Sequence, residues 1–233
     1  MKGLLVALAT LLAAGYAQAH DLWLEKEDGG FVLYYGHKYS AHGGANFVDY
    51  QLEWVREALC FDAAGARVPF QSGEVYPYRI RGECAVAHVS ISSGYWTKTP
   101  YGTENLAKDQ ARMPLESWLS HESVKRIERW GESLEKPLAA GLELTPLEDP
   151  FRLRKGEKLR LRVTFDGSPV EDAVVAYDGK PRGQPDPNGE INIRLRRGGF
   201  QVIQATLERA MASEMADQVI HSTNLNFEIP GER

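Results

Sequence analysis

The second half of the chain alternates apolar and polar residues with a period of two, and this pattern constrains the fold more than any other feature. In residues 159–165, Leu, Leu, Val and Phe fill every second position, with Arg, Arg and Thr between them. Similar short apolar runs follow, separated by turn sequences, at residues 173–177, 191–195, 201–207 and 223–229. Because side chains alternate between the two faces of a strand, this half predicts an immunoglobulin-like β-sandwich.

The first half of the chain has weaker signals of the same kind. Residues 21–25 and 31–35 have strand patterns on either side of a Glu-Asp-Gly-Gly turn, which predicts a β-hairpin. Further strands are expected in residues 51–61, 75–80 and 84–92. Residues 104–130 differ, since apolar residues recur there at helical spacing, which predicts one or two amphipathic helices. These residues are Leu115, Trp118, Leu119, Ile127 and Trp130.

These patterns predict a mainly β protein with two domains. An N-terminal β-rich domain with a helical insert would span residues 20–133, and the immunoglobulin-like domain would span residues 151–233. Between them, residues 134–150 contain three prolines and no sustained period, so we expect a linker.

The N-terminus has the pattern of a secretory signal peptide over residues 1–19. Lys2 precedes an apolar run at residues 3–14, and Ala17 and Ala19 place small residues at the positions that signal peptidase reads. We expect cleavage after Ala19 and a periplasmic mature protein. The alternative is an uncleaved anchor, but the run is short, and no later stretch approaches the roughly 20 apolar residues of a spanning helix. The mature chain is therefore not expected to span a membrane.

Charge and cysteine content restrict the partners and the compartment. The formal net charge of -5 argues against nucleic acids and anionic membranes as partners. Cys60 and Cys84 are an even pair, which in an oxidising compartment suggests one disulfide bond. A soft-metal site with two cysteine ligands is the alternative, although neither cysteine belongs to a CxxC motif.

Three histidines near the N-terminus give the strongest chemical signal. A mature chain beginning at His20 would offer two ligands from one residue, the α-amine and the imidazole. His37 and His42 belong to a glycine-flanked loop, and a hairpin of the first two strands would bring His37 near His20. The sequence therefore predicts a metal site of His20, His37 and His42. Nitrogen ligands suit Ni²⁺ and Cu²⁺ and, less selectively, Co²⁺ and Zn²⁺.

The other histidines give weaker signals. His88 belongs to an alternating strand, so we expect a packed or half-exposed side chain. His121 is expected to face solvent on a charged helix face, and His221, just before the last strand, stays open as a further ligand. Three acidic residues could add an oxygen ligand or orient an imidazole: Asp21, Glu25 and Asp49.

Several short motifs, in this order along the chain, resemble a known family. They are His20-Asp-Leu-Trp-Leu-Glu, the Tyr-Gly before His37, the segments 94–102 and 104–108, and the stretch 167–175. Together they resemble the NikK-type periplasmic proteins associated with energy-coupling-factor nickel/cobalt transporters. The resemblance implies binding of Ni²⁺, or of Co²⁺, and delivery to an inner-membrane transporter subunit. It implies His20 and His37 as ligands and leaves the role of His42 open.

Two other functions stay open at this point. The first is a copper protein that uses His20 as a histidine brace, either a copper carrier or an oxidative enzyme acting on polysaccharide. The second is a purely structural or adhesive β-sandwich without a metal. We expect no catalysis, because the sequence contains neither a Gly-x-Ser-x-Gly nucleophile motif nor a phosphate-binding glycine loop.

Overall fold

The computed structural model describes residues 21–27, 29–39 and 45–231. The predicted signal peptide, His20 and His42 lie outside these described residues. Within them, the regular structure consists of strands and three short 3₁₀ helices, so the expectation of a mainly β protein is confirmed. The 3₁₀ helices are η1 (Leu52–Trp54), η2 (Glu132–Glu135) and η3 (Pro150–Arg152). In this part of the chain, no helix has the length and apolar character needed to cross a bilayer.

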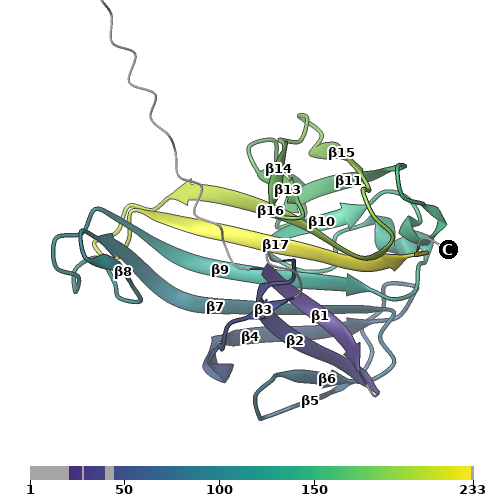
Figure 1. Ribbon diagram of the computed structural model, residues 1–233, viewed down its shortest axis with the longest axis horizontal. Coiled ribbons are helices and arrows are strands. Elements are labelled where there is room, and N and C mark those ends of the chain that lie inside the picture. Colours follow the sequence, from purple (N-terminus) through teal and green to yellow (C-terminus); the bar gives the residue numbers. More distant parts are fainter. Residues whose placement is uncertain (1–20, 28, 40–44, 232–233) are drawn as a thin grey trace, which may run out of the picture.

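An eight-stranded sheet, here called the central sheet, runs through the whole molecule (Figure 1). Its order is β14-β13-β16-β17-β9-β7-β4, and β8 pairs with β7. The single parallel pairing among its described strands joins β9 to β17. Its strands are β4 (Val55–Phe61), β7 (Val86–Thr99), β8 (Gly102–Glu104), β9 (Glu116–Ile127), β13 (Val174–Tyr177), β14 (Lys180–Gly183), β16 (Gly199–Ala210) and β17 (Gln218–Ile229).

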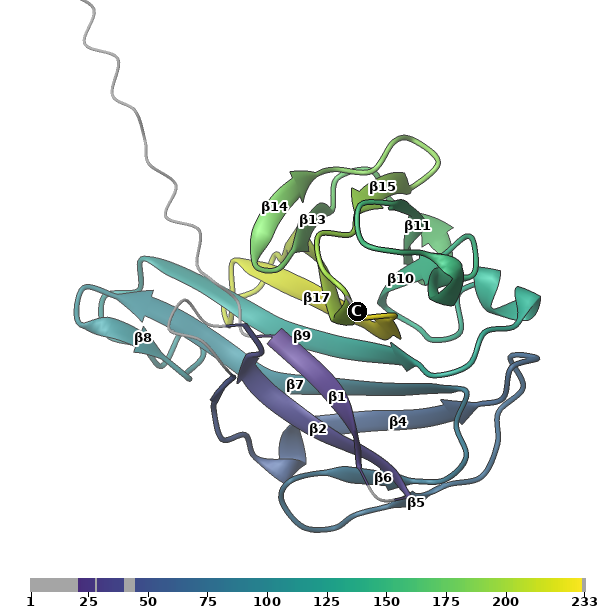
Figure 2. The ribbon, with the colours of Figure 1, turned by 45° about the vertical axis from the view of Figure 1, so that its right-hand side comes forward.

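Two smaller sheets pack against the central sheet. The N-terminal sheet contains β1 (Asp21–Glu27), β2 (Gly30–His37), β3 (Asn46–Phe47), β5 (Gln71–Ser72) and β6 (Arg79–Arg81). The C-terminal sheet contains β10 (Leu142–Pro146), β11 (Lys158–Phe165), β12 (Ser168–Pro169) and β15 (Glu190–Arg194). Figure 2 shows β1 and β2 on one side of β9 and β17, and β10 and β11 on the other.

Alternation along β4 shows that the two smaller sheets cover opposite faces of the central sheet. Leu59 and Phe61 belong to the core under the C-terminal sheet, together with Leu144 and Leu161. Cys60, between them, belongs to the core under the N-terminal sheet. Since neighbouring residues of a strand point to opposite faces, the molecule is a three-layer stack with the central sheet in the middle.

The predicted helical insert is wrong, because residues 116–127 form the strand β9. The last six residues of β9 are all buried, since both faces of the strand are covered there. A strand covered on both faces loses its apolar-polar alternation. Ser123, Lys125 and Arg126 are buried polar residues of this strand, so the remaining apolar residues fell at spacings that resemble a helical period.

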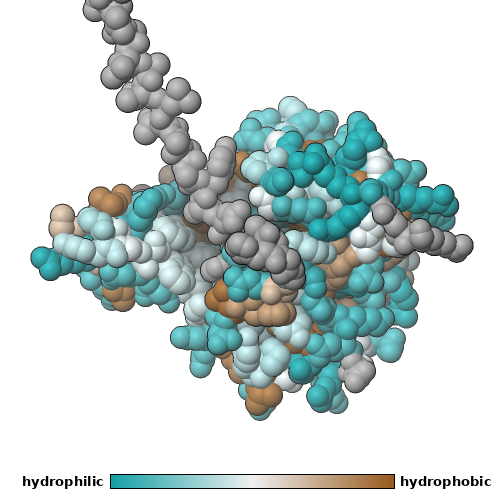
Figure 3. Space-filling model, viewed as in Figure 1, coloured by the Kyte–Doolittle hydropathy of each residue, from teal (hydrophilic) through white to brown (hydrophobic). Residues whose placement is uncertain are grey.

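The loop end of the central sheet, between β7 and β9, carries exposed apolar residues. Figure 3 shows this end as a projection with hydrophobic residues on an otherwise mostly hydrophilic face. The exposed large apolar residues between the two strands are Tyr101, Leu106, Met113 and Leu115. Of these four, Leu115 belonged to the helical pattern in the sequence, although its side chain is exposed and does not face the core.

The structure also bears on the predicted hairpin, linker and domain boundary. The hairpin is confirmed, with Asp21 to Glu27 paired to Gly36 to Gly30. Residues 134–150, expected to be a linker, contain the fully buried strand β10. The central sheet also crosses the proposed domain boundary, because β9 pairs with β17. The C-terminal sheet and the central sheet do form two packed layers, while their immunoglobulin-like character stays a prediction.

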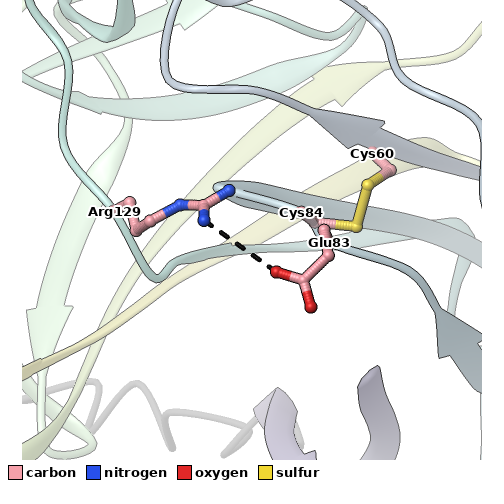
Figure 4. The surroundings of a disulfide bond; sticks show 4 residues. All are labelled: Cys60, Glu83, Cys84 and Arg129. Atoms are coloured by element: carbon pink, nitrogen blue, oxygen red, sulfur yellow. Dashed lines mark ion pairs between the residues drawn. A yellow bond between two sulfur atoms is a disulfide. The ribbon is translucent and has the colours of Figure 1, made fainter. Parts of the chain in front are cut away.

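The predicted disulfide bond between Cys60 and Cys84 is present, with a Cα–Cα distance of 5.2 Å. It connects β4 to the segment that leads from β6 into β7, and therefore fixes the point where the chain passes from the N-terminal to the central sheet. Next to it, Glu83 and Arg129 approach to 3.9 Å on the surface (Figure 4). Because both sulfurs are in the disulfide, the alternative of a two-cysteine metal site is excluded.

Candidate metal site

Of the three predicted metal ligands, the structure places His37. It is the last residue of β2, half-buried, and pairs with Asn46 of β3. On the other side of β2, the ladder with β1 ends at the pair Asp21 and Gly36. His37 therefore lies at the open end of the hairpin, next to the first described residue of the chain.

Gly36 is needed for this arrangement because β3 approaches β2 closely. Its φ of +138° is a conformation that side chains disfavour, and a Cβ here would lie 2.1 Å from the carbonyl oxygen of Asn46. A larger residue would push β3 away from β2. Gly36 thus fixes the backbone on which His37 is mounted.

Asp21 is the acidic residue closest to this point. Burial of its carboxyl raises its pKa to about 6, while the charge of His37 and a hydrogen bond from the backbone N–H of Lys38 act in the opposite direction. The carboxylate of Asp178, in the turn after β13, adds to the rise. The hairpin end is therefore close to the outer strands of the central sheet, and both His37 and the Asp178 carboxylate lie in the neighbourhood of Asp21.

Residues 38 and 39 attach the end of β2 to the start of β16. The Lys38 ammonium lies 4.9 Å from the ring centre of Phe200, and the Tyr39 hydroxyl donates a hydrogen bond of 2.7 Å to the Phe200 carbonyl. The guanidinium of Arg197 stacks 3.3 Å over the Tyr39 ring and is ion-paired with Asp178. Cation–π contacts of this kind stabilise by about 0.5–2 kcal/mol. They fix the direction in which the chain leaves His37.

The other two acidic candidates have different partners. Glu25 forms an ion pair with Lys38 and accepts a hydrogen bond of 2.8 Å from the indole N–H of Trp23. Asp49 accepts a hydrogen bond of 3.0 Å from the Tyr76 hydroxyl. Asp21 is therefore the acid best placed to assist His37.

No group of three or more His, Cys, Asp and Glu side chains that could hold a metal ion occurs among the described residues. His37 and Asp21 supply two donors at most. The other two predicted ligands, His20 and His42, lie outside the described residues. The predicted three-histidine set thus stays a prediction, of which one member is located.

The histidines outside the predicted set fall into two environments. His88 is 2% exposed, and neither ring nitrogen has a hydrogen-bond partner in the described structure, so the expected packed side chain is confirmed. Burial lowers its pKa to about 4. The expectation that His121 faces solvent on a helix is wrong. His121 lies on the strand β9 and stacks on His221 with 5.3 Å between ring centres. The sequence contained no signal for this pair, since the two residues are far apart along the chain.

Three stacked β-sheets and a disulfide bond define a disulfide-bonded β protein, which is consistent with an extracytoplasmic location. The chain belongs to the family described as Domain of unknown function (DUF4198), which matches residues 17–209. That match includes the N-terminal hairpin and most of the central sheet. No curated protein and no solved structure matches the chain.

Proposed function

We propose that the protein binds Ni²⁺, or alternatively Co²⁺, in the periplasm and delivers the ion to an inner-membrane transporter subunit. This is the function implied by its resemblance to the NikK-type proteins. In this proposal, the signal peptide of residues 1–19 is removed and the mature chain begins at His20. The α-amine and imidazole of His20 bind the ion together with His37, and His42 is the fourth candidate ligand.

The register of β1 and β2 is the observation that supports this proposal most directly. The ladder runs without a shift to the pair of Asp21 and Gly36. Extension by one residue would put position 20 opposite His37. Directly opposite residues of an antiparallel pair share a face, with Cβ atoms about 4.5–5.5 Å apart. Two imidazoles at that separation can reach one ion, since metal–nitrogen bonds are about 2.1 Å long.

The chemistry of the donors supports a carrier of a divalent ion. One amine and two or three imidazoles form a nitrogen-rich set, which binds Ni²⁺ and Cu²⁺ more tightly than Co²⁺. Asp21 offers a carboxylate that can complete the coordination or accept a hydrogen bond from a ligating imidazole. Binding and release of the ion need no chemical step, so the ion is cargo and the protein is proposed to have no enzymatic activity.

The α-amine is tested by calorimetric titration of Ni²⁺ into two forms of the protein. One begins at His20, and the other carries one additional residue before His20. We expect the additional residue to weaken Ni²⁺ binding by roughly a hundredfold or more, since it turns the amine into an amide and removes one ligand. Equal affinity in both forms would contradict the proposal.

Two further measurements make this experiment more specific. His37→Gln should also weaken Ni²⁺ binding, while His88→Gln serves as the matched control because the His88 ring is almost completely buried and belongs to no proposed ligand set. Titration with Cu²⁺ and an assay for oxygen consumption test the alternative. Copper loading with oxygen-dependent turnover on polysaccharide would favour the histidine brace over the nickel carrier.

A further inference from the structure

His121 and His221 lie side by side on the face of the central sheet that the C-terminal sheet covers. The parallel pairing of β9 and β17 puts the two residues directly opposite each other. Their rings are nearly parallel, with an interplanar angle of 14° and 5.3 Å between centres. Phe165, the last residue of β11, packs edge-on against the His221 ring at 4.7 Å. The fold therefore holds two imidazoles from distant parts of the chain as a defined pair.

Both imidazoles are accessible and have nitrogen atoms to offer. Each side chain is half-buried, in contrast to the fully buried His88. Within the described part of the chain, the contacts found for the two rings are with each other and with Phe165, and no hydrogen bond to either ring is among them. A ligand can therefore bind the nitrogens without breaking an internal hydrogen bond.

The charges around the pair permit a cation but limit its affinity. The carboxylate of Asp166, in the turn that follows Phe165, acts electrostatically on His221. Arg209 also acts on His221, but its guanidinium forms a two-bond ion pair with Asp172. Arg56 acts on His121, and its guanidinium points to the carbonyl of Ser92 at 3.5 Å. One carboxylate and one unneutralised guanidinium leave the local charge close to balance.

We propose that His121 and His221 form a second metal site, separate from the hairpin site, for a late first-row divalent ion. Metal–nitrogen bonds of about 2.1 Å put two nitrogens of one ion about 3–4 Å apart. Rings with centres 5.3 Å apart reach this spacing by rotation of the side chains, without movement of β9 or β17. Two imidazoles bind Cu²⁺ most strongly in the divalent series, with Ni²⁺ and Zn²⁺ below it. Water molecules or the Asp166 carboxylate would complete the coordination.

The test uses Cu²⁺ as the probe, in a full-length mature protein whose hairpin site has been disabled. That protein carries one additional residue before position 20 together with His20→Gln, His37→Gln and His42→Gln, so that none of the three hairpin imidazoles remains. We expect it to retain one Cu²⁺ site, whose electron paramagnetic resonance spectrum shows coupling to imidazole nitrogens. His121→Gln or His221→Gln added to this background should each weaken the site roughly tenfold or more.

The matched control is Ser222→Ala, which changes the neighbour of His221 on the opposite face of β17 and should leave Cu²⁺ affinity unchanged. Circular dichroism melting curves establish that each variant is folded. Unchanged Cu²⁺ affinity in both histidine variants, or nitrogen coupling that survives the loss of both rings, would overturn the second site. Because the hairpin ligands are absent throughout, these outcomes do not depend on whether the proposed Ni²⁺ function is correct.

Discussion

On the face of the central sheet that the C-terminal sheet covers, buried charges are paired, whereas on the face under β1, buried amides are left without partners. On the first face, Lys125 and Glu143 form an ion pair at 2.6 Å, and both side chains are almost completely buried. On the second face, neither the amide nitrogen nor the oxygen of Asn224 has a hydrogen-bond partner in the described structure. Asn226, two residues further on, uses its oxygen to accept a hydrogen bond from the backbone N–H of Leu24.

This difference concerns Glu143 and Asn224 in particular, since His88 on the first face also lacks hydrogen-bond partners in the described structure. The carboxylate of Glu143 also accepts hydrogen bonds from the backbone N–H groups of Leu138 and Ala139, so the ion pair fixes the entry into β10. A buried polar atom without a partner, by contrast, costs about 1–3 kcal/mol. The hairpin that carries the proposed site therefore packs over a buried amide without a partner, and the disulfide lies on its side of the sheet.

The largest expected effect comes from Glu143→Gln, which should lower the free energy of unfolding by about 4 kcal/mol. The change leaves the Lys125 ammonium buried without a counter-charge and replaces one oxygen that accepts backbone hydrogen bonds. Urea denaturation at neutral pH measures it. The matched control is Asp172→Asn, which breaks an exposed ion pair with Arg209 and should cost less than about 1 kcal/mol. Similar losses of unfolding free energy in both variants would mean that the buried ion pair contributes no more to stability than the exposed one.

A second prediction concerns His88, which faces Lys125 and Glu143 from β7. Its pKa is lowered from 6.5 to about 4, so between these pH values the unfolded chain binds a proton that the folded chain does not. The stability that depends on neutral His88 is therefore complete above pH 6.5 and is lost as the pH falls toward 4.

His88→Leu should remove this acid sensitivity. The difference in unfolding free energy between the variant and the natural protein should grow by about 3 kcal/mol from pH 7 to pH 4, in favour of the variant. Chemical denaturation at a series of pH values measures the difference. A difference that stays constant over this range would show that His88 does not remain neutral in the folded protein.

The smallest expected effects distinguish the two asparagines under β1. Asn224→Leu should raise the free energy of unfolding by about 1 kcal/mol, because it removes buried polar atoms that have no partner. Asn226→Leu should lower it by about 1 kcal/mol, because the Leu24 N–H loses its acceptor. If both substitutions stabilise the protein equally, the contrast between the two faces is smaller than the structure indicates.

Much of the fold could be predicted from local patterns. The alternation in residues 159–165 and the hairpin of residues 21–25 and 31–35 are local signals, and both led to the right strands. The strand β9 was predicted wrongly because it is covered on both faces and buries the charged residues Lys125 and Arg126, the first of them paired with Glu143 of β10. The parallel pairing of β9 with β17, and with it the single central sheet, depends on contacts between distant segments that no local period contains.

The candidate metal site also combines features that sequence patterns can predict with features that they cannot. The proximity of His37 to the start of β1 follows from hairpin pairing, which sequence patterns can predict. The neighbourhood of Asp21 and Asp178 could not be anticipated, because it depends on how the hairpin packs against β13 and β16. The pair of His121 and His221 was missed for the same reason, since the register between β9 and β17 brings them together.

The most direct test of the central claim is a crystal structure of the mature protein, beginning at His20, with Ni²⁺ bound and located by its anomalous scattering. We expect one strong peak at the open end of β1 and β2, within bonding distance of the His37 imidazole and of both the amine and the imidazole of His20. No peak at this hairpin when the protein is saturated with Ni²⁺, whether or not the ion occupies His121 and His221, would contradict the proposed site and the function built on it.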